Sequence, residues 1–170
     1  MSLWSSEFAP PNPPLYDQLV VDAQTLLDVQ LPTSYLELLA EQNGGYFDDR
    51  LVAVPADAVP DTLRGYVSDG YVTIGSIAGI GDSDSSGNIC HTPYFLREWS
   101  LPDRLVLLDG DGHWWIALDY RTAANDPPVI LVESDSATHL ELAPNFAAFL
   151  ASCVPYDSVY NEDGQLLSQR

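Results

Sequence analysis

The segment 104–120 constrains the fold of this chain more than any other. Two runs rich in β-forming residues, 104–108 and 113–120, flank the turn sequence Asp109-Gly110-Asp111-Gly112. Asp and Gly favour the tight turns that join antiparallel strands, so the segment is predicted to form a β-hairpin. Side chains alternate between the two faces of a strand, so Trp114 and Trp115 must point to opposite faces. Consequently, either both faces of the sheet are covered or one tryptophan is exposed.

The rest of the chain predicts helices at both ends of a sheet. Apolar residues recur at helical spacing over about 16–28 and again after Pro32, and Asn43-Gly44-Gly45 ends the second helix because Gly readily adopts the left-handed cap conformation. A closing helix is predicted from Pro144 to about 153. Short β-forming runs continue the sheet: 51–54, 71–74 and 129–132. This order predicts an α+β fold with N-terminal helices, a mainly antiparallel central sheet and a C-terminal helix.

The length of 170 residues fits one domain, which we place at 15–154. It is preceded by an extended proline-rich arm (1–14) and followed by a polar C-terminal tail (155–170) that we expect to be loosely packed. No apolar run approaches the length of a membrane span, and the first residues lack the pattern of a signal peptide. We therefore expect a cytoplasmic protein in which Cys90 and Cys153 remain free thiols.

Three segments, in order over roughly 26–153, resemble the SUKH superfamily of Smi/Knr-type proteins. The first is Leu31-Pro32-Thr33-Ser34-Tyr35-Leu36-Glu37-Leu38-Leu39, which leads to Asn43-Gly44-Gly45. The second is Asp111-Gly112-His113, which leads into Ala117-Leu118-Asp119-Tyr120-Arg121. The third is Pro128-Val129-Ile130-Leu131-Val132, followed by Phe146-Ala147-Ala148-Phe149-Leu150. Each motif residue also has an ordinary structural reading, as a helix start, a helix cap or an alternating strand position.

The resemblance implies a compact α+β fold with a sheet flanked by helices. Bacterial members of the superfamily are largely immunity proteins that bind and silence a cognate toxin, often a nuclease or a deaminase, whereas fungal members are linked to cell-wall assembly and signalling. The resemblance therefore predicts a non-enzymatic protein-binding module, an immunity protein for a toxin. Two alternatives are an intracellular scaffold or regulator of the same fold, and a small hydrolase or metal-dependent enzyme.

The charge of the chain restricts its partners. There are 25 Asp and Glu residues against 6 basic residues, all arginine, which gives a formal net charge of −19. Six scattered arginines cannot easily build the basic face that nucleic acids or anionic membranes require. A basic partner, by contrast, would be steered toward this surface, and a basic toxin fits that description.

The candidate partner contacts are acidic loops around the hairpin and one tryptophan. Asp82 and Asp84 lie in a polar loop, and Asp109 and Asp111 lie in the hairpin turn. If Trp115 is exposed beside these carboxylates, it would serve as an anchor for the partner. The alternative is that a helix covers Trp115.

Catalytic and cofactor motifs are incomplete. Asp82, Asp84 and Ser86 begin a calcium-loop pattern, but Pro93 stands where its bidentate Glu is required, which leaves at most a weak, open cation site. Segment 81–85 only approaches the G-x-S-x-G elbow, because Ser85 replaces its final glycine. No phosphate-binding Gly-Lys-Ser/Thr occurs. The remaining candidates, three histidines without zinc-site spacing, are His91, His113 and His139. We therefore assign no catalytic residue, cofactor or metal.

Overall fold

Two antiparallel sheets, ordered β2-β1-β7 and β3-β4-β5-β6, organise the computed structural model, which describes residues 2–81 and 87–167. The strands are β1 (Gly45–Ala53), β2 (Tyr71–Ile77), β3 (Leu105–Gly110), β4 (Trp114–Asp119), β5 (Val129–Glu133), β6 (His139–Ala143) and β7 (Cys153–Pro155). The helices are α1 (Asp17–Leu27), α2 (Thr33–Glu41), α3 (Thr92–Glu98) and α4 (Phe146–Ser152). The 3-10 helices are η1 (Ala56–Ala58), η2 (Asp61–Tyr66), η3 (Ile89–His91) and η4 (Tyr156–Ser158).

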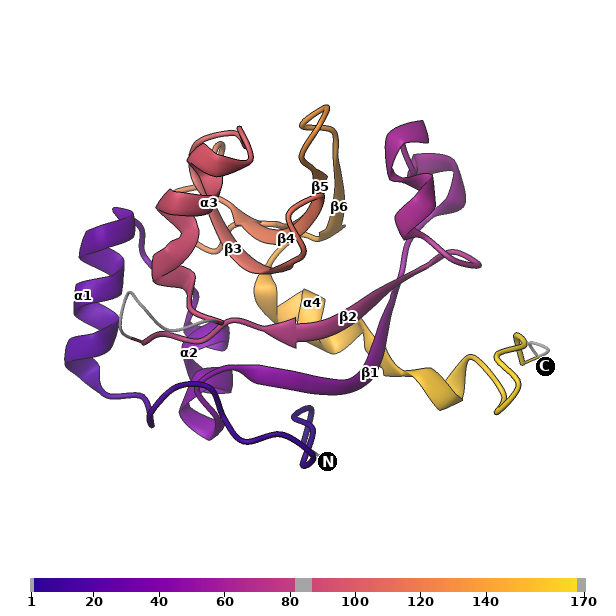
Figure 1. The fold of residues 1–170 in the computed structure, drawn as a ribbon, viewed down its shortest axis with the longest axis horizontal. Coiled ribbons are helices and arrows are strands. Elements are labelled where there is room, and N and C mark those ends of the chain that lie inside the picture. The colour runs from indigo at the N-terminus through magenta and orange to yellow at the C-terminus, as the bar shows by residue number, and fades with distance from the viewer. Residues whose placement is uncertain (1, 82–86, 168–170) are drawn as a thin grey trace.

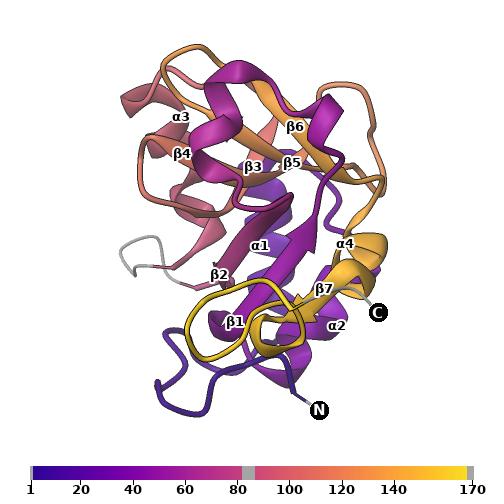
Figure 2. The same cartoon turned by 90° about the vertical axis from the view of Figure 1, so that its right-hand side faces the viewer.

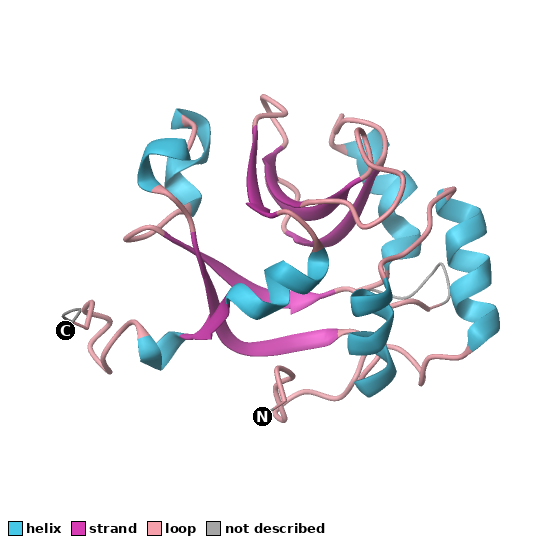
Figure 3. Cartoon of the chain, turned by 180° about the vertical axis from the view of Figure 1, so that it is seen from behind, coloured by secondary structure: helices cyan, strands magenta, loops and turns pink. Residues whose placement is uncertain are grey.

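The α+β class is confirmed, with the difference that the sheet is divided in two. The two sheets meet at the end of β2. There the amide of Ala78, the residue after β2, donates to the Leu108 carbonyl of β3 at 2.7 Å. Figures 1 and 3 show α4 lying between the four-stranded sheet and β1, with α1 and α2 at the opposite end from the C-terminus. Helix α4 packs on β6, β1 and α2, where Phe146 meets Tyr35 with ring centroids 5.2 Å apart. None of the helices in the described ranges is both long and apolar enough to span a bilayer.

The predicted hairpin is present as β3 and β4, with Val106 opposite Leu118. Strand β5 pairs with the other edge of β4. The side chains of β4 alternate between the two faces of the sheet and enter two separate clusters. Ile116 and Leu118 join the main core, and Trp115 and Ala117 join a second cluster beneath α3. Both faces of this sheet are therefore covered.

The Asn43-Gly44-Gly45 motif does more than end α2. The buried Asn43 side chain donates from Nδ2 to the carbonyls of Pro13 (2.7 Å) and Ile80 (2.6 Å). Its Oδ1 accepts from the Ile80 amide at 2.8 Å. Gly44 has φ +84°, and a Cβ there would lie 2.5 Å from the Gly79 nitrogen. The motif thus joins the N-terminal arm, the end of α2 and the segment after β2.

The Asp119–Arg121 pair explains part of the second motif. The Asp119 side chain is buried at the end of β4, and Arg121 donates to it from Nε (2.8 Å) and Nη2 (2.7 Å). Burial alone would raise the pKa of Asp119, but the hydrogen bonds and positive charge of Arg121 outweigh burial and lower it. The ionised form of Asp119 is therefore more strongly favoured in the folded state than in the unfolded chain.

This pair gives a pH prediction for Asp119→Asn. A carboxyl whose pKa is lowered on folding stabilises the protein fully above the unfolded value of about 3.9, and this contribution is lost as pH falls through the folded value. Near pH 6 we expect the wild type to have a higher melting temperature than the variant. We expect this difference in melting temperature to shrink as the pH falls toward 3. Thermal unfolding over this pH range measures the difference, and a difference independent of pH would contradict the assignment.

The N-terminal arm and the described part of the C-terminal tail pack onto β1 and its neighbours. The arm runs beside β1, where the Ser5 amide donates to the Tyr46 carbonyl at 2.8 Å and Trp4 is buried. The described part of the tail buries Val159 and Tyr160 against Leu51, which is tighter packing than its polar composition indicated. Figure 2 shows the yellow C-terminal segment and the indigo arm on the same side of the molecule, beside β1.

Candidate protein-binding surface

Of the predicted contact residues, Asp109 is a structural carboxylate. It accepts from Ser76 Oγ at 2.7 Å and from the Gly110 amide at 2.9 Å, so it ties β3 to β2. Burial raises the pKa of Asp109, and these hydrogen bonds offset part of the rise. Asp111 is exposed, but its Oδ1 accepts from the amides of His113 (2.9 Å) and Trp114 (3.3 Å) and so shapes the hairpin turn.

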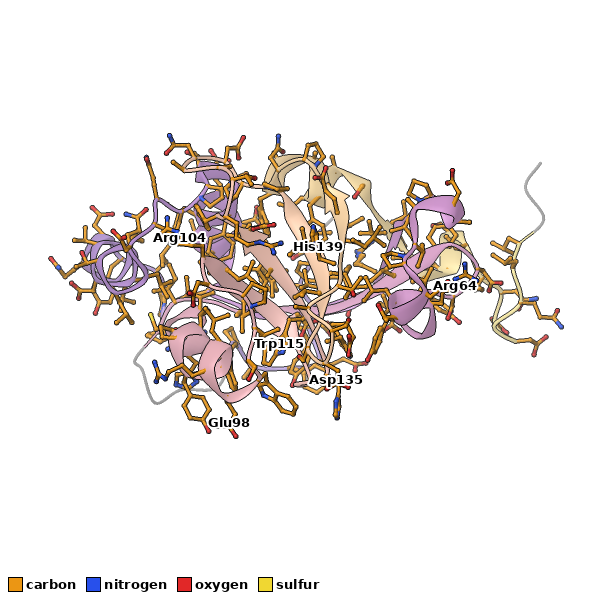
Figure 4. All side chains as sticks on the ribbon, turned by 90° about the horizontal axis from the view of Figure 1, so that it is seen from above. Arg64, Glu98, Arg104, Trp115, Asp135 and His139 are labelled. Carbon is orange, nitrogen blue, oxygen red and sulfur yellow. The ribbon has the colours of Figure 1, made fainter. Side chains whose placement is uncertain are left out.

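The interpretation of Trp115 as an exposed anchor needs correction. The residue is only 6% exposed, because α3 covers the sheet face onto which it projects. Its ring lies 5.0 Å from that of Phe95, and its Nε1 donates to the Gly112 carbonyl at 3.2 Å. Figure 4 shows Trp115 in the middle of the molecule and Glu98 at the outer edge of α3. The structure therefore agrees with the alternative that a helix covers Trp115.

Asp82 and Asp84, with the rest of the calcium-like segment up to Ser86, lie outside the described residues. Of the predicted contact residues that the structure describes, Asp111 is exposed, Asp109 is partly buried and Trp115 is buried. In residues 2–81 and 87–167, no three His, Cys, Asp or Glu side chains gather where they could hold a metal ion. His91 and His113 instead lie against aromatic rings, those of Phe95 and Trp99.

A different surface gathers exposed acids and aromatics, and a bulge in β1 creates it. From Tyr46 to Arg50, β1 advances four residues while its partner β2 advances from Ser76 to Ile74. Strict alternation would bury one of Asp48 and Asp49, but the bulge leaves both exposed and turns Arg50 inward. Two adjacent carboxylates therefore project from one strand.

The two chain ends complete this surface. From the arm, the Phe8 ring lies 4.8 Å from that of Tyr46, although the two side chains remain 53% and 56% exposed. Strand β7 pairs with β1, with Pro155 opposite Arg50, so the residues after it reach the same place. We name this surface the acidic–aromatic face: Glu7, Phe8, Tyr46, Asp48, Asp49, Tyr156 and Asp157.

A cavity of about 530 Å³ opens in this face, lined by the arm, β1 and residues 155–157. Its volume lies within the range of about 300–1,000 Å³ that is typical of ligand pockets. Arg50 lines it and is only 7% exposed. Nearby, Cys153 is a free thiol, and burial raises its pKa to about 11 against the opposing effect of Arg50. That thiol is protonated at neutral pH and is a poor nucleophile.

Exposed aromatics surrounded by carboxylates are suited to binding cationic side chains. Carboxylates pair with Lys and Arg, and the faces of Tyr and Phe rings attract the same cations. Aromatic residues are also enriched among the anchors of protein interfaces. The arrangement can therefore bind cationic side chains at this face.

Comparison with known families identifies the family to which the chain belongs. The sequence profile described as the SMI1 / KNR4 family (SUKH-1) matches residues 14–152. The chain belongs to the SMI1 / KNR4 family. The resemblance seen in the three motifs is thereby confirmed. No curated protein matches the chain closely enough to serve as a relative.

The SMI1 / KNR4 match and the acidic–aromatic face overlap only in part. Tyr46, Asp48 and Asp49 lie within the matched residues, whereas Glu7 and Phe8 precede them and Tyr156 follows them. The motifs that carry the family resemblance are largely buried or hydrogen-bonded, as Tyr35, Asn43 and Asp119 show. In this SMI1 / KNR4 protein, the shared residues build the fold, and the segments outside the match supply part of the exposed face.

Sequence reasoning missed this face because its members are distant along the chain. One local signal was present: Tyr46 and Asp48 alternate with buried Phe47 on a strand, which leaves an aromatic and an acid side by side outside. The bulge that adds Asp49 has no comparable signature in the sequence. Neither does the return of residues 155–157 to β1.

Proposed function

We propose that this protein is a non-enzymatic binding module that neutralises a cognate basic bacterial toxin, as an immunity protein of the SMI1 / KNR4 family. The observation that carries the proposal is the acidic–aromatic face on a chain of net charge −19. Membership of the family supports it, because immunity is the role that the resemblance implies for bacterial members. A nuclease or deaminase domain would present the cationic substrate groove that such a face fits.

The binding steps follow from the charge distribution. The acidic surface steers the basic toxin at long range, which accelerates association by roughly 10–1,000-fold at low ionic strength. Contacts between toxin cations and the acidic–aromatic face then hold the complex. By occupying the groove, the carboxylates would replace the phosphates that a nuclease binds, and inhibition would follow without any chemical step.

The test is titration of the purified protein against the toxin encoded beside its gene, with association followed by stopped-flow fluorescence. We expect tight binding at low salt and an association rate that falls about tenfold between 15 and 150 mM salt, because exposed charges are screened over about 8 Å at the higher value. Absence of binding at low salt, or a flat salt response, would contradict the proposal.

Matched variants locate the interface. Asp48→Asn combined with Asp49→Asn removes two charges from the acidic–aromatic face, whereas Glu98→Gln combined with Asp103→Asn removes two exposed charges near α3. If the face contacts the toxin, we expect the first pair to weaken binding about tenfold or more and the second by less than about threefold. Equal effects of the two pairs would exclude this face as the interface.

A further inference from the structure

Arg50 is a buried cation that has no partner in the described residues. Its Nε is buried without a hydrogen bond, and no ion pair in residues 2–81 and 87–167 includes it. By contrast, Arg64, Arg104 and Arg121 each pair with an aspartate. Burying a charge is costly unless it is paired or hydrogen-bonded, so an arginine that is 7% exposed, with a buried Nε that lacks a hydrogen bond and with no ion pair, indicates a site whose anion is supplied from outside.

The position of Arg50 fits a ligand site. The bulge in β1 turns the side chain inward, where it lines the cavity of about 530 Å³ together with Phe47 and Ser5. The residue is 7% exposed, whereas Asp48, Asp49 and Asp157, which line the same cavity, are exposed. The cavity therefore has a cationic floor and an acidic rim.

Neither a simple anion nor a simple cation suits this arrangement. The carboxylates of Glu7, Asp48, Asp49 and Asp157 would repel an anion on its way to Arg50. A plain cation at the rim would leave the guanidinium unpaired. A ligand that carries a carboxylate and a cationic group satisfies both parts, because guanidinium binds a carboxylate through two parallel hydrogen bonds and the rim attracts the cation.

We propose that this cavity binds a basic α-amino-acid end group, with its α-carboxylate on Arg50 and its cationic side chain among the rim carboxylates. The group can be free arginine or lysine, or the C-terminal residue of a protein chain. The proposal deepens the proposed function, since a basic partner would present such a chain end at the acidic–aromatic face. The aromatic rings of Phe8 and Tyr156, which line the cavity, would flank the aliphatic part of the side chain.

Isothermal titration of the whole protein tests the proposal without any toxin. The probes are the peptide Gly-Gly-Ser-Arg with a free C-terminal carboxylate, the same peptide with a C-terminal amide, free L-arginine, and agmatine, which is arginine without its carboxylate. We expect the free-acid peptide to bind at least tenfold more tightly than its amide. L-arginine should likewise bind at least tenfold more tightly than agmatine.

The two sources of the end group are separated by one comparison. A peptide that binds more tightly than free arginine indicates a chain end, and the reverse indicates a small molecule. Equal binding of acid and amide, or binding of neither, would overturn the proposal. Toxin binding is measured separately, so its failure and the failure of the peptide are distinguishable.

Arg50→Gln provides the variant. We expect it to bind the free-acid peptide at least tenfold more weakly than wild type, with little change for the amide. Its melting temperature should stay within a few degrees of the wild-type value, since the missing group has no partner in the described part of the folded chain.

Should this variant fail to fold, Asp48→Asn with Asp49→Asn is expected to weaken binding of the free-acid peptide about threefold or more. The control pair Glu98→Gln with Asp103→Asn should leave it unchanged, and an equal effect of both pairs would count against the site.

Discussion

Trp115→Ala should destabilise the protein by about 3–5 kcal/mol, because it removes a buried aromatic side chain and leaves a cavity between β4 and α3. The indole fills the space over Ala117 and against Phe95, and its Nε1 hydrogen bond to the Gly112 carbonyl would also be lost. Single domains have about 5–15 kcal/mol of stability in total, so this one truncation would remove a large share of it. Urea denaturation followed by circular dichroism measures the change.

Tyr94→Ala is the matched control for this experiment. Tyr94 lies on the same helix and its ring contacts Phe95 at 5.3 Å, but its side chain is 55% exposed. Its removal should therefore change stability by about 0.5 kcal/mol or less. If instead Trp115→Ala were as mild as Tyr94→Ala and abolished partner binding, the tryptophan would be an exposed contact after all.

Asn43→Ala should cost about 3 kcal/mol or more. The substitution leaves the carbonyls of Pro13 and Ile80 and the Ile80 amide without their partner, and each buried group left unsatisfied costs about 1–3 kcal/mol. For a chain of this size, a loss of 1 kcal/mol lowers the melting temperature by about 2–4 °C, so we expect a drop of at least about 6 °C. Differential scanning calorimetry provides the measurement.

The control for Asn43 is Asn125→Ala, which truncates the same residue type at an exposed loop position. It should shift the melting temperature by only about a degree or two. A similar small shift for Asn43→Ala would mean that water replaces the lost hydrogen bonds, and that the motif serves only to end α2.

Local patterns predicted the local structure well. The hairpin followed from two β-rich runs around an Asp/Gly turn, and α1 followed from helical spacing, with bounds of Asp17–Leu27 against an expected 16–28. What local patterns could not reveal was which distant element covers each face. The two tryptophans allowed either two covered faces or one exposed ring, and only the docking of α3 decides between them.

The candidate surface was harder to predict for the same reason. Asp109 looked available in the sequence, yet in three dimensions it is engaged by Ser76, which lies 33 positions away along the chain. The exposed Asp48 and Asp49 depend on a β-bulge, and the inward turn of Arg50 depends on it too. Net charge leads us to expect a basic partner, but it does not indicate where on the fold the charges gather.

The packing of the N-terminal arm along β1 has a consequence for solubility at high concentration. On the side away from β2, only residues 50–52 of β1 pair with β7, so the first half of the strand would otherwise present free backbone groups. The arm bonds to the backbone there, through the Ser5 amide to Tyr46 and the Asp48 amide to Leu3. Uncovered sheet edges are templates for aggregation, and charged residues on them oppose such pairing. Asp48 and Asp49, which we propose as partner contacts, therefore also oppose self-association through this edge.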